Sequence, residues 1–324
     1  MRRVVIAQNS LEIEGLRGLW EHLHAQSPGA TLFQSFALNE LAARMLNGGS
    51  PLVVAAESDS GAAIIPAAVS NGCITLLGES LFDYRDVLSD GDPEALSLAW
   101  STLSEQELPL RIAGIRGDTD CPMWELLGWD AWCAAPCVRH TPNAAVDYCG
   151  AHSRLGSRLR RLQRAGAELK HYSGGEPSLV RWIYRKKAEQ QTAFAPNIFA
   201  ERERIDFMVA WCALAGRLCD IYCFEAGSEI VSALVTFRDS TPHPARRFYT
   251  IYFDPRWEKF SPGTVLVYEV ARRSLQEGLE ADFMTGEQPH KLRLAADSVP
   301  LYQVSTGAAE MRVAAEEVDQ RVAA

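Results

Sequence analysis

Residues 247–264, RFYTIYFDPRWEKFSPGT, contain the junction that decides the fold. Their first part is rich in aromatic and β-branched residues and predicts a strand over Arg247–Asp254. After a short loop, we expect a helix over Pro262–Gly278. Ser261 suits the N-cap of this helix, and Pro262 suits its first position, where a missing N–H costs nothing. The chain therefore passes from a buried strand directly into the N-terminus of a helix.

The two halves of the chain repeat one order of elements. In the C-terminal half we expect strands at Asp220–Glu225, Glu229–Arg238, Arg247–Asp254 and Ala281–Thr285, with the helix Pro262–Gly278 before the last. In the N-terminal half we expect strands at Leu52–Glu57, Ala62–Val69, Cys73–Leu77 and Pro109–Ile115, with a helix Pro93–Glu107. Antiparallel strands with one crossover helix that returns to the sheet indicate an α/β (α+β) fold. We therefore predict two tandem domains, each with a mixed, mostly antiparallel sheet flanked by helices.

A helical insert separates the two copies. Ser153 suits the N-cap of its first helix, in which leucines recur on one face and arginines cover the rest. Further helices are expected at Pro177–Thr192 and Ala200–Gly216, with a break at Pro196-Asn197. This organisation predicts an N-terminal domain over residues 1–150, followed by the insert and the C-terminal domain over residues 151–324. The tail after residue 306 is either a terminal helix or disordered.

Composition narrows the class of protein. The formal net charge of -9 argues against general nucleic-acid binding, because polyanions are held mainly by Lys and Arg. The N-terminus lacks the apolar run of a signal peptide, and no stretch approaches the ~20 apolar residues of a membrane span. We therefore expect a cytoplasmic protein with no membrane span.

The eight cysteines are expected to be reduced and buried. Two pairs, Cys133/Cys137 and Cys219/Cys223, have a spacing that raises the question of zinc. The second pair lies in a predicted strand, and neither pair has the close CxxC spacing of structural zinc sites. We therefore predict that the protein holds no metal.

The segment Lys259–Thr264 is the first candidate site. A helix N-terminus offers unpaired N–H groups and partial positive charge, so it can hold an anion. Gly263 lets a ligand approach the backbone, and Lys259 and Thr264 can assist. Alternatively, this segment is only a capped helix start.

The second candidate is Gly286–Arg293, GEQPHKLR, directly after the last predicted strand. Loops at strand ends commonly carry ligand-facing groups. Glu287 can act as a general base, and His290 is its rival because its ordinary pKa is near neutrality. Lys291 or Arg293 can hold an anionic group. The alternative is a solvated, charged loop.

A third cluster, Phe82–Asp86, occupies the equivalent loop of the N-terminal half. Its polar side chains can bind an acceptor through Asp83, Tyr84 and Asp86. In the other interpretation, Asp83 and Asp86 form an internal salt bridge with Arg85.

The insert carries a fourth candidate. Its first helix includes Arg154, Arg158, Arg160, Arg161 and Arg164 on an otherwise acidic protein. Such a run is usually a solvated helix face, but it can also dock an acidic macromolecular partner such as a carrier protein or a tRNA. We name Arg154, Arg158 and Arg161 as the residues of such a surface.

Several of these segments together resemble a known family. The segments are Leu32–Ser35, Gly78–Asp86, the run SRLRRLQR, Phe253–Pro255 with Phe260–Gly263, and Gly286–Lys291, and they occur in the family's order. The chain resembles the GNAT-superfamily acetyltransferases of the cellulose-biosynthesis (CelD/BcsL-like) group, which are related to the FemABX peptidyltransferases. The resemblance covers roughly residues 30 to 300. In the loop motif GxxPYK of these relatives, His290 here replaces the aromatic residue.

This resemblance implies two GNAT-like domains and an acyltransferase. The donor is expected to be acyl-CoA, usually acetyl-CoA, bound through Lys259, Ser261, Gly263 and Thr264. The acyl group would pass directly to an amine or hydroxyl of a small-molecule, polysaccharide or peptide acceptor, with Glu287 or His290 as base. The N-terminal copy lacks the Ser-Pro-Gly segment and is expected to be structural or acceptor-binding. Alternatives are a transferase that takes its acyl group from aminoacyl-tRNA or a carrier protein, and a non-catalytic scaffold in envelope or exopolysaccharide assembly.

Overall fold

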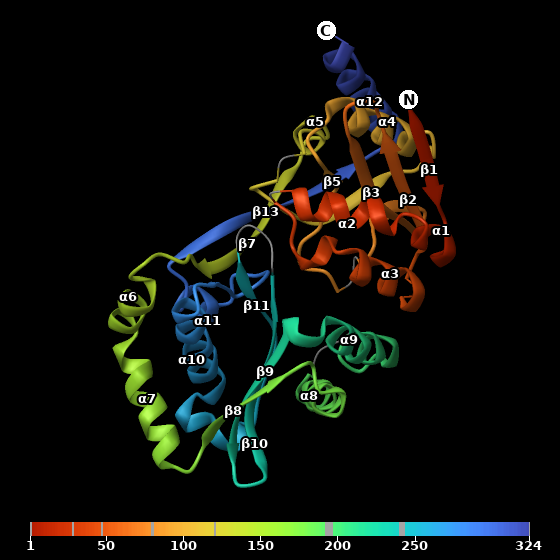
Figure 1. The fold of residues 1–324 in the computed structure, drawn as a ribbon. Helices are drawn as coiled ribbons and strands as arrows, with labels where there is room; N and C mark the ends of the chain where they lie inside the picture. The colour runs from red at the N-terminus through yellow and green to blue at the C-terminus, as the bar shows by residue number, and fades with distance from the viewer. Residues whose placement is uncertain are drawn as a thin grey trace. The chain divides into compact units, whose positions relative to one another are not determined.

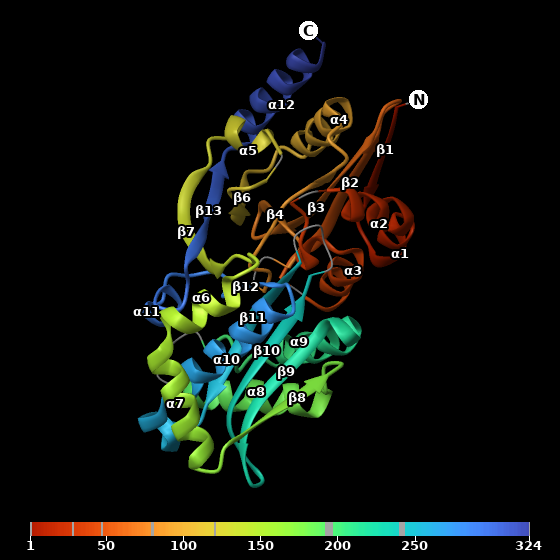
Figure 2. The same ribbon diagram turned by 60° about the vertical axis from the view of Figure 1, so that its left-hand side comes forward.

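The computed structural model describes residues 2–27, 29–46, 48–78, 81–119, 121–191, 197–239 and 244–323. Within the motifs above, Glu79, Ser80 and Pro196 lie outside these residues. The chain divides into two units, Met1–Ala134 with Val299–Ala324, and Ala135–Ser298. Figures 1 and 2 show the elements of each unit.

The first unit is built on a mixed sheet. Its strands are β1 (Arg3–Ala7), β2 (Ser50–Glu57), β3 (Ala62–Ser70), β4 (Cys73–Leu76), β5 (Leu88–Ser89), β6 (Leu110–Arg116) and β13 (Asp297–Thr306). Their order is β1-β2-β3-β4-β6-β13, with β5 beside β3, and only the β4–β6 pair is parallel. The helices are α1 (Ser10–Glu14), α2 (Arg17–Gln26), η1 (Leu32–Gln34), α3 (Phe36–Met45), α4 (Pro93–Ser104), α5 (Met123–Leu126) and α12 (Ala308–Ala323).

Alternation along β2 explains why helices cover both faces of this sheet. Leu52, Val54 and Ala56 pack in one apolar cluster with Trp100 of α4, and α12 joins the same cluster. The residues between them, such as Val53, pack in a second cluster with α1 and α2. Successive side chains of a strand point to opposite faces, so a strand that is apolar throughout needs cover on both sides.

The second unit contains a second mixed sheet. Its strands are β7 (Asp130–Val138), β8 (Glu168–Ser173), β9 (Cys219–Ala226), β10 (Glu229–Arg238), β11 (Ala245–Phe253) and β12 (Glu280–Asp282). The order is β7-β12-β11-β10-β9-β8, and only the β11–β12 pair is parallel. The helices are α6 (Ala144–Ala151), α7 (Ser153–Arg164), α8 (Pro177–Gln190), α9 (Arg202–Ala215), η2 (Gly216–Leu218), η3 (Pro255–Phe260), α10 (Pro262–Gln276) and α11 (Pro289–Leu292).

Two layers of helices enclose the second sheet, as Figure 2 shows. On one face, α10 packs on the strands, and α6 and α7 pack on α10 through side chains such as Leu162 and Tyr148. On the other face lie α8 and α9. Trp211 of α9 stacks on Phe237 of β10, with ring centroids 4.1 Å apart, and meets Tyr249 of β11 edge-on at 4.9 Å.

The fold prediction is confirmed, and most predicted elements lie within a few residues of the observed ones. The boundary between the two units lies between Ala134 and Ala135, whereas the predicted boundary at residue 150 falls inside α6. The C-terminal helix α12 packs with the first unit rather than with the second. Ser153 is the first residue of α7 rather than its cap, which is His152. All eight cysteines are free thiols. In the described ranges, no helix is long and apolar enough to cross a bilayer.

Two adjacent arginines near the start of β11 have buried, charged side chains. Arg247, 4% exposed, donates to Asp239 at 2.8 Å and also to Asp282 of β12. Arg246, 1% exposed, points to the other face, where its guanidinium bonds Ser274 of α10 at 3.1 Å and Glu277 at 2.9 Å. Such pairs are costly to break because a buried partner is left uncompensated.

Replacing Arg247 should therefore destabilise the protein strongly. Arg247→Met removes the guanidinium that compensates two buried carboxylates, and we expect the free energy of unfolding to fall by about 3–5 kcal/mol. Denaturant unfolding of the full chain measures it. The matched control is Arg139→Met, which breaks the exposed Arg139–Asp297 pair and should cost at most about 1 kcal/mol. Equal, small effects of both substitutions would contradict the role given to Arg247.

Candidate functional site

The first feature of the site is the point where β11 and β12 part. The two strands pair only at Ala245–Glu280, Arg246–Ala281 and Arg247–Asp282. Beyond Asp282 the chain turns away, and the N–H of Phe283 donates to the carbonyl of Pro136 at 3.0 Å. No strand of the described chain pairs with the same edge of β11 from residue 248 onward. An unpaired strand edge can bond an extended ligand through its backbone N–H and C=O groups.

A β-bulge lies on β11 beside this opening. Thr250 pairs with Val235 of β10, and Phe248 pairs with Thr236, so Tyr249 is the extra residue of the bulge. Bulges increase the local twist and bend the strand that carries them.

The second feature is the N-terminus of α10, which β11 reaches through η3. Asp254 caps η3 by accepting the N–H of Arg256 at 2.9 Å. Ser261 then adopts a left-handed conformation, with φ 52°, and α10 begins at Pro262. Ser261 lies at the N-cap position as predicted, but its side chain does not bond the first turn of the helix. The first-turn N–H groups of α10 have no intrahelical acceptors and remain available to an anion.

Close packing at Gly263 brings α10 against β11. A Cβ on this glycine would lie 3.3 Å from the Phe253 ring and 3.4 Å from the Ile251 side chain. Gly263 is therefore needed for helix–strand packing as well as for access to the backbone. Thr264, the next residue, is half-buried.

Positive side chains from two elements surround this helix N-terminus. Arg158 of α7 donates to the Ser261 hydroxyl at 3.2 Å. Lys259 is exposed, with its ammonium 5.1 Å from the centre of the Phe260 ring. The sequence does not show that α7 lies here, because the arginine run and the Ser-Pro-Gly segment are a hundred residues apart. The structure brings the first and fourth predicted clusters together.

The third feature is a polar cluster on the α8 side of the sheet. The Tyr184 hydroxyl and the Thr250 hydroxyl, both buried, lie 2.8 Å apart directly after the bulge. One turn later on α8, Lys187 lies over the Phe199 ring at 5.5 Å. Burial, and then the charge of Lys291, lowers the pKa of Lys187. Sequence analysis missed Tyr184 and Lys187, because a lysine and a tyrosine in an amphipathic helix carry no signal of their own.

The loop after β12 places His290 and Lys291 near Lys187. Met284 has a left-handed φ of 64°, and its N–H donates to Asp282 at 2.7 Å. The Lys291 ammonium donates to the Thr285 carbonyl at 2.7 Å and so stabilises the turned loop. Burial lowers the pKa of half-buried His290, and the charges of Lys291, Arg293 and Lys187 lower this pKa further. His290 is therefore held as a neutral imidazole.

The other two predicted residues of this loop are at the surface. Glu287 is exposed, and no hydrogen bond or ion pair holds its carboxylate among the described residues. Arg293 is also exposed. Of the predicted base candidates, His290 is the one whose surroundings favour the uncharged form, which can accept a proton.

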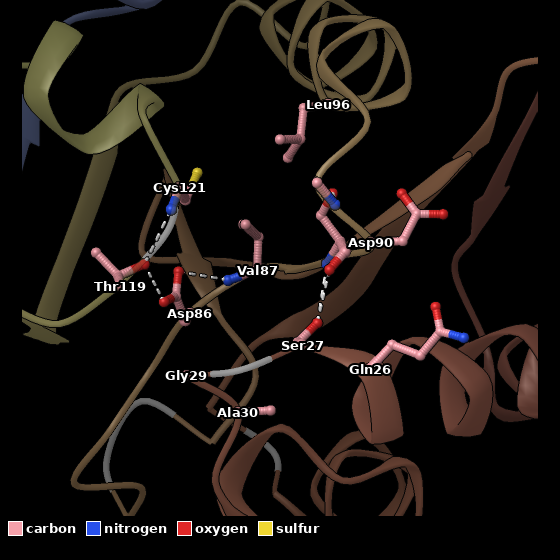
Figure 3. A pocket seen from close by; sticks show the side chains of 12 residues that line it. Gln26, Ser27, Gly29, Ala30, Asp86, Val87, Asp90, Leu96, Thr119 and Cys121 are labelled. Atoms are coloured by element: carbon pink, nitrogen blue, oxygen red, sulfur yellow. Dashed lines mark hydrogen bonds between the residues drawn. The ribbon is translucent and has the colours of Figure 1, made fainter. Parts of the chain in front are cut away.

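The first unit contains a separate pocket, shown in Figure 3, with a volume of about 250 Å³. Asp86 lines it and accepts hydrogen bonds from the Thr119 hydroxyl, from the Trp124 indole at 2.8 Å and from the Val87 N–H at 2.8 Å. Burial raises the pKa of Asp86 to about 6, although these three hydrogen bonds lower it. Cys121 also lines the pocket, and burial raises the pKa of its thiol.

The neighbours of Asp86 are placed differently. Tyr84 is fully buried, and its ring meets Phe33 edge-on at 5.6 Å, with Arg116 over its face at 4.9 Å. Asp83 is half-buried, and neither residue lines the pocket. Arg85, the alternative partner of these carboxylates, donates to the Ala113 carbonyl. Of the three predicted acceptor-binding residues, Asp86 is the one that lines this pocket.

Comparison with known proteins supports the fold. Residues 151–292 match the family model described as acetyltransferase (GNAT) domain. This part of the chain is similar to GNAT-type acetyltransferase domains. No curated protein sequence matches the chain.

Three solved structures resemble the whole chain at low identity. A conserved protein of unknown function from Bacteroides thetaiotaomicron has a TM-score of 0.64 at 12% identity, covering 93% of this chain and all of that one. FemX has a TM-score of 0.59 at 9% identity, covering 90% of this chain and 94% of that one. A tandem GNAT protein from the clavulanic acid pathway has a TM-score of 0.50 at 12% identity, covering 95% and 99%. The similarity of this chain to the tandem GNAT protein and to FemX agrees with the predicted fold of two tandem domains.

The raised pKa of Asp86 predicts how its replacement changes stability with pH. Its folded pKa of about 6 lies above the ordinary 3.8, so this group favours the native state at low pH. That contribution is lost as pH rises through about 6. Asp86→Asn removes the titration, so the variant should gain stability relative to the parent between pH 4.5 and 7. Urea unfolding of both proteins at these pH values tests this, and a pH-independent difference would contradict it.

Proposed function

We propose that the second unit transfers an acyl group from acyl-CoA to an amine or hydroxyl. The leading candidate for this group is acetyl. The observation that carries the proposal is the unpaired edge of β11, which leads directly to the N-terminus of α10 in a GNAT-type domain. Membership of the CelD/BcsL-like group within the GNAT superfamily remains part of this proposal.

Two parts of the donor, its pyrophosphate and its pantetheine arm, would bind at two places on the second unit. The pyrophosphate would lie at the α10 N-terminus, bonded by first-turn N–H groups of Gly263 and Thr264 and attracted by Arg158 and Lys259. The extended pantetheine arm would follow the free edge of β11, where amide groups can pair with strand N–H and C=O groups. The thioester would thus reach the bulge at Tyr249, where a backbone N–H of β11 would stabilise the oxyanion.

The chemical step would be direct attack by the acceptor on the thioester carbon. A new C–N or C–O bond forms, the C–S bond breaks, and the CoA thiol leaves with a proton. His290 would take the proton from the acceptor, because its pKa is lowered and it is neutral at pH 7. Glu287 is the rival base, and its carboxylate is exposed. Lys291 would act by holding the loop that carries His290.

A second candidate donor is favoured by the surface of α7. Its segment SRLGSRLRRLQR has no acidic residue, and in the described structure none of its five arginines pairs with a carboxylate. Arg154 and Arg161 flank Arg158 and are exposed. An anionic macromolecular donor, such as a tRNA or an acidic carrier protein, would contact the whole of this arginine surface. A small nucleotide would contact only a part of it.

Removing Arg158 should weaken acetyl-CoA binding. A charge-assisted hydrogen bond to a phosphate contributes about 1.5–3 kcal/mol, so we expect Kd to rise about tenfold or more in Arg158→Ala. Calorimetric titration of the full chain measures this. The control is Arg164→Ala, two turns further along α7, which should leave Kd unchanged. If wild-type protein binds no acyl-CoA, the CoA proposal fails and the donor is sought among carrier proteins and tRNA.

The base is identified by the pH dependence of turnover. CoA release from acetyl-CoA would be followed with the best amine from a panel of glucosamine, spermidine and lysine. The acid limb of kcat/KM should lie below about pH 6.5, since His290 titrates below its ordinary pKa. His290→Gln should lower kcat about 10²–10⁴-fold and erase this limb. Glu287→Gln should leave both unchanged, and the reverse pattern would assign the base to Glu287.

A further inference from the structure

The pocket of the first unit in Figure 3 carries negative charge without a compensating positive charge. Of the described residues that line it, Asp86 and Asp90 are acidic, and none is a lysine, arginine or histidine. Within the described chain, the groups that hydrogen-bond these two carboxylates are all neutral N–H and O–H donors. We propose that this pocket binds a small aliphatic amine in its charged, ammonium form.

Asp86 has a vacant acceptor position for such a cation. Its Oδ1 accepts both the Trp124 indole N–H and the Val87 N–H, each at 2.8 Å, whereas its Oδ2 accepts the Thr119 hydroxyl alone. A carboxylate has about four acceptor positions, so Oδ2 can take one more hydrogen bond. The side chain is half-buried, and a carboxylate withdrawn from water is normally paired with an opposite charge. A ligand with a charged N–H group would supply both the hydrogen bond and the charge.

The carboxylate of Asp86 is ionised under ordinary conditions. Burial raises its pKa to about 6, and the three hydrogen bonds limit the rise. The group is therefore mostly negative at pH 7.5, and a bound cation would relieve the cost of its burial.

Asp90 adds a second negative charge at the open side of the pocket. It is exposed, and its two oxygens accept the N–H groups of Ala62 at 3.0 Å and of Asp92 at 3.1 Å. Each oxygen keeps acceptor capacity for a ligand. Two like charges at one opening attract cations and repel anions. The charge of the pocket therefore determines the sign of the ligand.

The walls of the pocket favour an organic cation over a metal ion. Ala30, Val87 and Leu96 are buried and line it with apolar surface, which suits methylene groups. Its volume of about 250 Å³ is below the ~300–1,000 Å³ of pockets for larger ligands, so the ligand must be small. Among the described residues, no group of three or more His, Cys, Asp or Glu side chains could hold a metal ion. A short methylene chain with a terminal ammonium matches both the walls and the charge.

The inference concerns binding in the first unit, so it depends neither on the proposed donor nor on the chemical step. The test is calorimetric titration of the full chain at pH 7.5, without any acyl donor, with three five-carbon probes. These are cadaverine, 1,5-pentanediol and glutarate, which share one chain length and differ in charge. We expect saturable binding of cadaverine, at least about tenfold weaker binding of the diol, and none of glutarate. Cadaverine should bind more weakly at 500 mM than at 50 mM NaCl, because salt screens its attraction to the open pocket.

Two substitutions localise the site. Asp86→Asn keeps the shape of the side chain and removes its charge, so the Kd of cadaverine should rise about tenfold or more. Asp90→Asn should raise it less, about 2–5-fold, because this carboxylate is exposed. The matched control is Glu57→Gln, which removes one negative charge from the first unit outside the pocket and should leave Kd unchanged. The melting temperature of each variant checks that it is folded.

Three outcomes would overturn the inference. In the first, the folded wild-type protein does not bind cadaverine. In the second, the diol binds as tightly as cadaverine, so that the pocket does not select charge. In the third, Asp86→Asn binds cadaverine as tightly as the parent, or Glu57→Gln weakens binding equally, so that the cation is held by the overall negative charge of the protein. Each of these results leaves acetyl-CoA binding by the second unit to be judged separately.

Discussion

Arg247 holds β11 and β12 together at the last point where these two strands pair. Its guanidinium bonds Asp239 and Asp282 in a buried setting, and beyond it the strands part. A sheet normally closes such an edge, because unpaired backbone groups in the interior are costly. The buried ion pairs allow the chain to leave one edge of β11 open at a defined residue. The bulge at Tyr249 follows two residues later.

The other parts of the candidate site are arranged around this opening. The end of β11 leads through η3 to α10, so a helix N-terminus follows directly from the open strand. From the α10 side, Arg158 reaches the same junction, whereas Lys187 and His290 belong to the α8 side and the loop after β12. Positive charge at the helix start suits an anionic ligand. The charges of Lys291, Arg293 and Lys187, together with burial, lower the pKa of His290 and keep its imidazole uncharged.

Local patterns were sufficient to predict the fold but not the site. The strands of both halves and the helix at Pro262 follow from hydrophobic periodicity and from the capping, Gly and Pro residues at the ends of elements. These signals depend on residues that are close together in the sequence. The unit boundary, β7 and β13 could not be placed, because strand partners far apart in sequence determine them. Arg247 and Asp282 look like ordinary charges until β11 and β12 are paired. The sequence put Glu287 before His290 as the candidate base, and burial and neighbouring charges single out His290 only in the structure.

Hydrogen–deuterium exchange of the full chain, with and without acetyl-CoA, tests the central claim most directly. If the open edge of β11 and the start of α10 hold the donor, exchange should slow in residues 248–253 and 262–266. Peptides of β3 in the first unit should exchange at an unchanged rate. Protection confined to the first unit, or no protection in these two segments at saturating acetyl-CoA, would contradict the account.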